Sequence, residues 1–243
     1  MALMAEIMGS VKEPTSVSEA LADPKWKEAM ESEYDSIIKN GTWQLVVPPP
    51  KRKVEGFDVY ETFAPTARMT SIRTVLALAA HYHWKIFQMD VKSAFLNGEL
   101  KEEVYVSQPP GFEVSNEEHK VCKLIKALYG LKQAPRAWYR RIDDFLKSIG
   151  FSKSYSDSNV YVLRQDNFIV IIILYVDDLI ITGGNEDQIH HTKEQLKSEF
   201  EMTDLGLMHF CLGIEVLQQA GIFVGIFPLL IGIFAGRRPA VKR

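Results

Sequence analysis

The stretch IVIIILYVDDLIITGG, residues 169–184, places two adjacent acidic residues inside a strongly hydrophobic part of the chain. Seven of the eight residues from Ile169 to Val176 are strongly apolar, and three more apolar residues follow Asp177 and Asp178. An ionised carboxylate is costly to bury unless it is paired or holds a metal. The pattern therefore predicts two buried strands that meet at an acidic pair. The position of this pair between apolar strands needs a chemical explanation.

Two readings of the acidic pair are open at this point. Aspartate tolerates turns, so the pair could be a solvated hairpin turn, although the flanking strands are very apolar for an exposed ribbon. The other reading needs a further carboxylate nearby, and Asp90 fits because it lies near the end of the alternating segment WKIFQMDV, residues 84–91. If that strand pairs beside residues 168–176, Asp90 and Asp177 meet at one sheet edge. Carboxylates are natural ligands of Mg²⁺, and paired ions of this kind promote phosphoryl transfer.

The rest of the chain predicts a mixed α+β fold. Helical spacing of apolar residues, with capping residues or glycine at the ends, predicts helices near residues 24–39, 70–82, 135–149 and 186–200. Strands are expected near residues 84–91, 103–108, 121–126, 159–163, 168–176, 179–182 and 209–217. Strands and helices do not alternate strictly, so an α+β sheet is favoured over a doubly wound parallel one.

Composition sets weaker limits on function. The 243 residues carry a formal net charge of −3, so a nucleic-acid role needs a local basic surface. Cys122 and Cys211 form no zinc-binding spacing and are interpreted as reduced core thiols. Residues 1–13 lack the continuous apolar core of a signal peptide and are expected to be a loose leader.

The last part of the chain has a different character. The segment GIFVGIFPLLIGIFAG, residues 221–236, is almost wholly apolar, but its 16 residues include Pro228 and four glycines. A helix needs roughly 20 apolar residues to span a bilayer, so no stable membrane insertion is expected. We interpret residues 221–243 as an atypical tail that does not belong to the original design of the domain.

Several long motifs sharpen the reading of the aspartates. The segments MDVKSAFLNGEL (89–100), VYVSQPPGF (104–112), LIKALYGLKQAPRAWY (124–139) and LYVDDLIITG (174–183) resemble the reverse transcriptase of copia-type LTR retrotransposons, part of a Pol polyprotein. Two upstream stretches, residues 19–46 and 61–80, match the same family. The resemblance implies a polymerase palm, an antiparallel sheet packed on helices, within a fingers and palm region at residues 14–220.

The resemblance also implies a role for each matching residue. Asp90 and Asp177, with the backbone of Val91, would hold two Mg²⁺ ions, for which Mn²⁺ could substitute, and Asp178 would be their companion carboxylate. The residues implied to bind the dNTP are Val91, Lys92, Ser93, Ala94, Phe95 and Tyr129, with Phe95 as a steric gate against the ribose 2′-hydroxyl. The residues implied to contact an RNA or DNA template and its primer are Gly130, Lys132, Gln133, Arg136, Tyr175, Val176, Leu212 and Gly213.

Plainer readings stay open for some of these residues. Phe95 alone could be a core aromatic, and Lys132 and Arg136 could belong to a solvated basic face. The segment CLGIEV, residues 211–216, could be an ordinary core strand rather than the primer grip that the resemblance implies.

The sequence departs from the family at two places. The first is near residues 50–54, where PPPKRK (48–53) leads almost directly to VEGFDVYETFAP (54–65) and the basic fingers hairpin is expected to be missing. The second follows residue 219, where the sequence leaves the pattern of the family and the thumb is expected to be missing. Loss of a cationic clamp removes charge stabilisation from the transition state, so impaired polymerase activity is expected. The alternatives are an inactive retrotransposon relic with at most weak nucleic-acid binding, and another Mg²⁺-dependent phosphotransfer enzyme. For localisation, the resemblance implies the cytoplasm and nucleus, although the sequence has no recognisable targeting motif. No sequence pattern indicates the oligomeric state.

Overall fold

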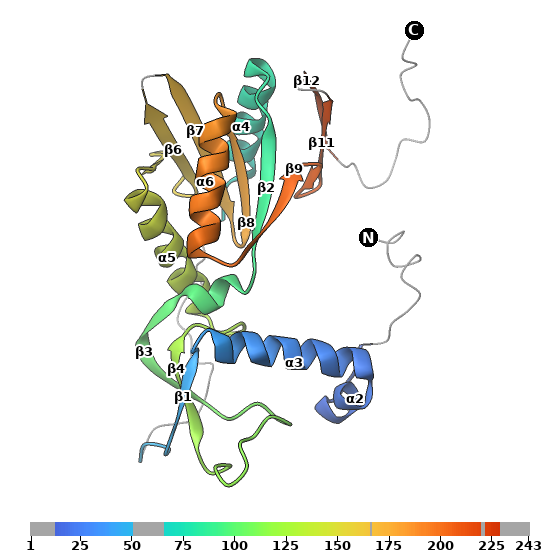
Figure 1. Ribbon diagram of the computed structural model, residues 1–243, viewed down its shortest axis with the longest axis vertical. Coiled ribbons are helices and arrows are strands. Elements are labelled where there is room, and N and C mark those ends of the chain that lie inside the picture. Colours follow the sequence, from blue (N-terminus) through green and yellow to red (C-terminus); the bar gives the residue numbers. More distant parts are fainter. Residues whose placement is uncertain (1–12, 51–65, 166, 220–221, 229–243) are drawn as a thin grey trace. The chain divides into compact units, whose positions relative to one another are not determined.

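The chain is divided into two compact units. The computed structural model describes residues 13–50, 66–165, 167–219 and 222–228 (Figure 1). The first unit comprises Met1–Ala64 and Ser93–Ile142, and the second comprises Pro65–Lys92 and Asp143–Arg243. Both units combine helices with antiparallel sheets, which confirms the predicted α+β class. Residues 51–53 of PPPKRK and the segment that follows to residue 65, on which the missing hairpin was inferred, lie outside the described residues, so that inference stays a prediction.

A six-stranded antiparallel sheet forms the centre of the second unit. Its strand order is β5-β6-β7-β8-β2-β9. The strands are β5 (Ser152–Lys153), β6 (Val160–Gln165), β7 (Phe168–Tyr175), β8 (Asp178–Gly183), β2 (Ile86–Val91) and β9 (Met202–Leu207). The strands predicted on either side of the acidic pair are therefore neighbours, and the strand that carries Asp90 pairs with the second of them.

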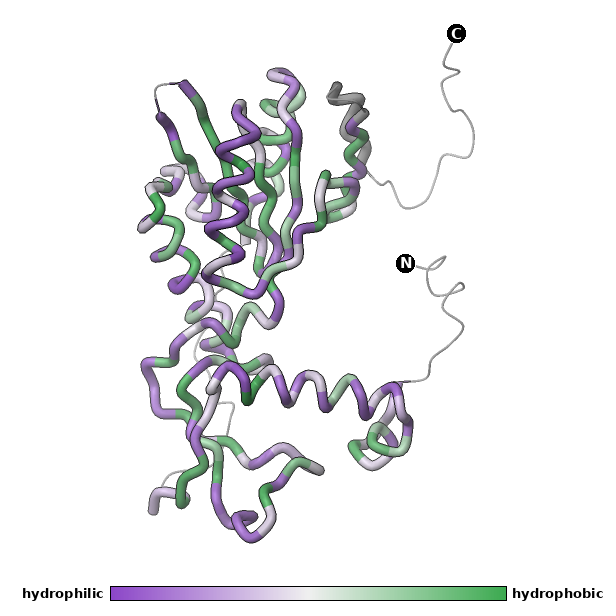
Figure 2. Tube along the Cα trace, in the orientation of Figure 1, coloured by the Kyte–Doolittle hydropathy of each residue, from purple (hydrophilic) through white to green (hydrophobic). Residues whose placement is uncertain are grey.

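Helices cover both faces of this sheet. Helix α4 (Met69–Tyr82) contributes Ile72, Leu76 and Ala79 to a core cluster that also contains Ile86, Ile173 and Ile180. Helix α6 (Glu186–Glu199) lies over the opposite face in Figure 1 and buries Ile189 and Leu196. Because both faces are covered, β7 is buried from Val170 to Leu174, and Figure 2 shows β7 and β8 as largely hydrophobic beside the more polar α6. This explains why the sequence reads as a continuous apolar run rather than an alternating one.

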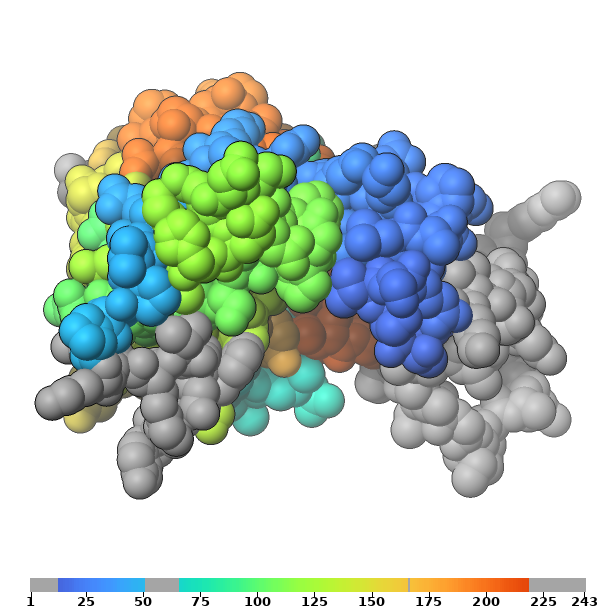
Figure 3. Space-filling view, turned by 90° about the horizontal axis from the view of Figure 1, so that it is seen from below, coloured from blue at the N-terminus to red at the C-terminus, as the bar shows by residue number. Residues whose placement is uncertain are grey.

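The first unit is built on a three-stranded sheet with the order β1-β4-β3. The strands are β1 (Trp43–Val46), β4 (Val121–Lys126) and β3 (Glu99–Val106), and a 3-10 turn, η1, covers Ala94–Asn97. Helices α2 (Val17–Ala22) and α3 (Pro24–Lys39) precede the sheet, and the predicted cap is present because the Asp23 side chain accepts from the Lys25 N–H. Figure 3 shows α2 and α3 in blue beside the green β3–β4 connection, where Tyr34 stacks on Phe112 at 4.6 Å between ring centroids.

Helix α5 (Ala134–Ser148) passes from the first unit to the second. Its residues up to Ile142, which include Arg136 and Trp138, belong to the first unit, and its residues from Asp143 onward belong to the second. The helix was predicted over residues 135–149 from Pro135 and the terminal Gly150, and the structure agrees to within one residue at each end.

The C-terminal part of the described chain forms a separate three-stranded sheet. The strand predicted at residues 209–217 is instead split into β10 (Phe210–Cys211) and β11 (Ile214–Gln219), because the chain turns at Leu212 and Gly213. The beginning of the apolar tail forms β12 (Ile222–Pro228), which pairs antiparallel with β11. No helix in the described part of the chain is long and apolar enough to cross a membrane.

Candidate active site

The two apolar strands meet in a strained two-residue turn. Tyr175 at the end of β7 pairs with Asp178 at the start of β8, so Val176 and Asp177 form the turn between them. Val176 has a φ of +58°, which is rare for a β-branched residue. Two-residue hairpin turns require a positive φ at their first central position, and such strain persists only where the surroundings fix it. The turn therefore presents Asp177 in one defined place.

The three predicted aspartates come together at this turn. Asp90 lies directly opposite Asp178 in the register of β2 and β8. The backbone oxygen of Asp177 accepts a hydrogen bond of 3.0 Å from the N–H of Val91, the residue after Asp90. Since Asp90 and Asp178 are cross-strand partners, their side chains lie on the same face of the sheet. The structure places Asp90 beside the acidic pair, as the sequence predicted. The expected pairing of the Asp90 strand beside residues 168–176 is wrong, because β8 lies between β2 and β7.

The clustered negative charge changes the protonation of Asp90. Burial raises the pKa of the Asp90 carboxyl above its ordinary value, and the charges of Asp177 and Asp178 raise it further. The ammonium group of Lys92 opposes this shift but does not cancel it. A group whose charged form is disfavoured by neighbouring like charges gains from a nearby cation. The site is therefore electrostatically prepared for a positive ligand.

Gln88 is part of this site, although sequence reasoning did not find it. Its side-chain amide donates a hydrogen bond of 2.9 Å to Oδ1 of Asp178. Gln88 is two residues before Asp90 on β2, and alternation in a strand places both side chains on the same face. The spacing of two residues from Asp90 was the available signal for Gln88, but a single glutamine in a strand is not a recognisable motif. The side chain of Gln88 therefore binds Asp178 and not Asp90 or Asp177.

The donor set fits a divalent ion that also binds water and substrate. Within the described ranges, no three or more His, Cys, Asp or Glu side chains are grouped closely enough to form a metal cage. Mg²⁺ usually takes one or two protein carboxylates and completes its shell with water and phosphate oxygens. Asp90 and Asp177 match that pattern in number and in chemistry.

Lys92 connects the end of β2 to the start of β9. Its N–H donates to the backbone oxygen of Glu201 at 2.9 Å, and its ammonium nitrogen lies 3.6 Å from a carboxylate oxygen of the same residue. Both side chains are exposed, so the ion pair contributes little to stability. Its position one residue beyond Val91 keeps a mobile cation close to the aspartates.

A second hairpin lies near the acidic cluster. Leu212 and Gly213 join β10 to β11 and have φ angles of +51° and +76°, the pattern of a tight hairpin turn. Burial raises the pKa of the neighbouring Cys211 thiol to about 11, and the charge of Asp178 adds to that shift. Cys211 and Leu212 belong to the same core cluster as Tyr175, which pairs with Asp178, so this hairpin packs on the part of the sheet that leads to the aspartates.

Gln218 fixes the same hairpin to the main sheet. Its side-chain oxygen accepts from the N–H of Ile86 at 2.9 Å, and its amide nitrogen donates to the Ile86 and Met208 carbonyls at 3.0 and 2.9 Å. Ile86 is the first residue of β2, four residues before Asp90. One side chain thus ties the strand with the predicted primer residues to the strand with Asp90.

The remaining predicted residues belong to the first unit. Ser93 has a φ of +48° and opens η1, and the ring of Phe95 meets Tyr129 edge to face at 4.7 Å between centroids. Ala94 is buried, while Lys132 and Arg136 are exposed. Gly130, with a φ of +84°, and the half-buried Gln133 lie near the start of α5. The structure brings Phe95 and Tyr129 together, and the roles of all these residues stay predictions.

Comparison with known proteins matches this chain to a single type of enzyme domain. The family model described as "Reverse transcriptase (RNA-dependent DNA polymerase)" matches residues 40–226. The chain is 40% identical over 87% of its length to the "Retrovirus-related Pol polyprotein from transposon RE1" of Arabidopsis thaliana. It is 41% identical over 86% of its length to the corresponding polyprotein from transposon TNT 1-94 of Nicotiana tabacum. The matches cover 17% and 18% of those polyproteins, so the chain spans less than a fifth of their length.

Proposed function

Because the chain belongs to the reverse transcriptase family, as a reverse transcriptase domain of a copia-type Pol polyprotein, we propose that it extends a primer with dNTPs on an RNA or DNA template. In this reaction the primer 3′-hydroxyl attacks the α-phosphorus of the incoming dNTP. A new O–P bond forms to the primer, the bond to the β-phosphate oxygen breaks, and pyrophosphate leaves. Catalysis of this kind depends mainly on positioning and on charge stabilisation.

The observation that supports this proposal most strongly is the pairing of Asp90 with Asp178 beside the turn that presents Asp177. Reverse transcriptases generally use divalent metal ions. Asp90 and Asp177, with the backbone of Val91, would hold two Mg²⁺ ions, or Mn²⁺ in their place. When bound, the ions supply positive charge to the attacking and leaving oxygens.

The chain's own residues hold this arrangement in place. The Val91 N–H fixes the turn through the Asp177 carbonyl, and Gln88 orients Asp178 through its amide. Lys92 is exposed one residue beyond Val91, with an ammonium group that can turn to the triphosphate. These contacts keep the acidic groups in position without help from the substrate, which is the main requirement for catalysis by preorganised charge.

We assign the sugar and base of the incoming nucleotide to the Phe95–Tyr129 pair. The edge-to-face contact at 4.7 Å holds the Phe95 ring in one orientation, as a steric gate against a 2′-hydroxyl requires. The remaining dNTP contacts are assigned to Lys92, Ser93 and Ala94.

The template and primer contacts are proposed on both units. Lys132 and Arg136 are exposed cations that can neutralise phosphates, and Gly130 and Gln133 accompany them at the start of α5. In the second unit, Tyr175 ends β7 and Val176 is the first residue of the turn that carries Asp177. Leu212 and Gly213 form the tip of the hairpin that Gln218 attaches to β2.

Primer extension tests the proposal directly. Purified chain is given a poly(rA) template, an oligo(dT) primer, dTTP and Mg²⁺ or Mn²⁺, beside an Asp177→Asn variant. We expect extension by the parent chain and none by the variant, because the substitution removes a carboxylate charge without changing the size of the side chain. Extension of equal rate in both would contradict the assignment of Asp177.

A noncatalytic relic is the second candidate, and the sequence around residues 48–65 favours it. The sequence there lacks the residues expected of a basic fingers hairpin, and we propose that the hairpin is missing and that any extension is slower than that of a relative which has it. A cooperative melt with no extension under either metal would identify the chain as a relic with at most weak nucleic-acid binding. Nucleotide turnover without a primer would instead indicate a different phosphotransfer enzyme.

A further inference from the structure

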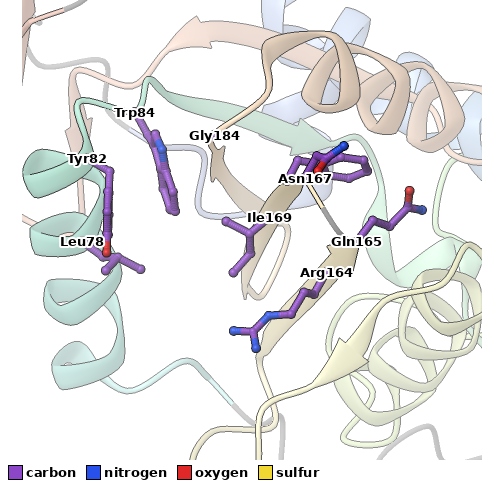
Figure 4. Close-up of a pocket in the computed structure, with 9 residues that line it drawn as sticks. Leu78, Tyr82, Trp84, Arg164, Gln165, Asn167, Ile169 and Gly184 are labelled. Atoms are coloured by element: carbon purple, nitrogen blue, oxygen red, sulfur yellow. The ribbon is translucent and has the colours of Figure 1, made fainter.

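A pocket of about 490 Å³ lies in the second unit, away from the aspartates. It is formed where the end of α4, the β6–β7 connection and Gly184 meet (Figure 4). Strand β7 begins at this pocket with Phe168 and ends with Tyr175 at the catalytic turn. At about 3.3 Å per residue, the pocket and the turn are about 23 Å apart. The pocket is therefore a separate site on the same sheet.

One wall of the pocket is a fixed pair of aromatic rings. Tyr82 and Trp84 stack with 5.0 Å between centroids and an angle of 19° between planes. The N–H of Trp84 donates to the Ala79 carbonyl at the end of α4, which holds the backbone of this residue in place. Gly184 lies behind the indole, and a Cβ there would come within 3.2 Å of the Trp84 ring nitrogen. The absence of a side chain at Gly184 lets the indole stand flat against the strand ends.

The other side of the pocket carries a positive charge. Figure 4 shows the Arg164 guanidinium pointing past Ile169 toward α4, into the space that the rings border. Among the residues that the structure describes, no carboxylate forms an ion pair with Arg164. Arginine keeps its charge at any physiological pH and binds planar or tetrahedral anions through several N–H donors. Gln165 and Asn167 add amide donors and acceptors to the rim.

We propose that this pocket binds a nucleoside monophosphate unit, with the base against the Tyr82–Trp84 pair and the phosphate on Arg164. Base stacking on aromatic rings combined with arginine contacts to phosphate is how proteins hold single nucleotides without reading their sequence. The volume lies within the range of small-ligand sites, about 300–1,000 Å³. A free nucleotide and the phosphorylated end of a single strand share this chemistry. The site does not depend on the polymerase activity proposed above.

Intrinsic tryptophan fluorescence measures this binding. The full chain is titrated in EDTA, which leaves the metal-dependent nucleotide site silent, with dAMP, deoxyadenosine or a 5′-phosphorylated tetradeoxyadenylate. We expect saturable quenching by dAMP that is lost in Trp84→Phe, because the quenched indole is the one in the pocket. Arg164→Gln should weaken dAMP binding about tenfold, as loss of a charge-assisted contact does, and leave deoxyadenosine binding unchanged.

Two variants serve as controls. Arg73→Gln makes the same chemical change at an exposed position of α4 outside the pocket and should bind dAMP as the parent chain does. Asp177→Asn should also bind normally, which separates this site from the catalytic one. If the tetranucleotide binds more tightly than dAMP, and more weakly as salt is added, the occupant is a strand end; equal binding indicates a free nucleotide.

Three outcomes would overturn the proposal. Quenching that persists in Trp84→Phe would place the ligand elsewhere, and equal dAMP affinity in Arg164→Gln would remove the phosphate contact. Tighter binding of N-acetylphenylalaninate, which does not emit in the tryptophan range, than of dAMP would reassign the pocket to aromatic carboxylates. Because Arg164 is exposed, its variant is expected to fold, and a cooperative melt checks this.

Discussion

Gln88 donates its side-chain amide to Asp178 from a position two residues before Asp90 on the same strand. One strand therefore carries both Asp90, a carboxylate that we propose to be catalytic, and the group that holds its cross-strand neighbour. Asp178 is kept in a fixed orientation beside Asp90, while Asp177 is presented by the strained turn. The three aspartates have three different local environments, which is how adjacent carboxylates take different roles.

The Gln88 contact predicts a catalytic effect without loss of folding. Gln88→Leu should lower the rate of primer extension about tenfold and weaken Mn²⁺ binding, because Asp178 loses its donor and is free to reorient. Electron paramagnetic resonance of free Mn²⁺ measures the binding independently of activity. Gln44→Leu, at an exposed position of β1, is the matched control and should leave both quantities unchanged. Identical Mn²⁺ affinity in Gln88→Leu and the parent would show that Gln88 has no positioning role.

The raised pKa of Asp90 predicts that this carboxyl lowers the stability of the folded chain at neutral pH, although we propose that it is needed for function. A carboxyl whose pKa is raised on folding destabilises the folded chain at pH values above its ordinary value of 3.8, where the unfolded chain ionises more easily. Asp90→Asn should therefore raise the urea midpoint at pH 7, and the gain should vanish below pH 3.8, where the carboxyl is protonated in both states. Mg²⁺ should stabilise the parent chain but not the variant. A midpoint at pH 7 that falls in Asp90→Asn would contradict this reading.

Asp143 predicts the opposite pH dependence. Burial pushes the pKa of its carboxyl upward, but hydrogen bonds from Lys147, Lys153 and Tyr161, at 2.8, 3.0 and 3.0 Å, outweigh burial and lower it. The resulting stabilisation is present above the ordinary value of 3.8 and is lost as pH falls through the lowered pKa. Asp143→Asn should cost about 2 kcal/mol in free energy of unfolding at pH 7.

The neighbouring Asp144 provides the control for this measurement. Asp144 is exposed, so Asp144→Asn should change the free energy of unfolding very little. Urea denaturation of both variants at pH 7 and at pH 3 separates the two positions. The idea fails if both substitutions cost the same.

Phe95 predicts the choice of sugar. Phe95→Val should raise the ratio of rNTP to dNTP incorporation by about tenfold or more, because a smaller side chain no longer meets the 2′-hydroxyl. Tyr129 contacts the same ring, so Tyr129→Phe, which keeps the edge-to-face pair, should leave the ratio unchanged. Single-nucleotide extension with dTTP or UTP measures the ratio. An unchanged ratio in Phe95→Val would return Phe95 to the role of a core aromatic.

Much of the sheet edge that carries the aspartates could be predicted, because its signals are strong and local. The apolar run that begins at Ile169 predicted a buried strand, which is β7, and the alternation around Asp90 indicated which residues share a face of β2. The copia-type resemblance is confirmed by the family match and by the polyprotein relatives. The roles of the individual residues remain predictions.

The parts that were missed have weak or misleading signals. Strand β9 (MTDLGL) is a half-exposed edge strand, so its residues show no clear hydrophobic period. The split of the final strand occurs at Leu212, which has a positive φ although leucine is not a turn residue. Gln88 and Gln218 act through side-chain amides whose partners are distant in sequence, and no local pattern reveals such contacts.

Gln218 has a consequence for how this chain tolerates variation. Its amide imitates a short piece of backbone: it gives Ile86 one acceptor and one donor, as a neighbouring strand would. The hairpin at Leu212 and Gly213 is thus attached to β2 through one side chain of β11. A single substitution at Gln218 that removes the amide would delete all three of its hydrogen bonds, whereas the pairing of β12 with β11 is made by backbone groups.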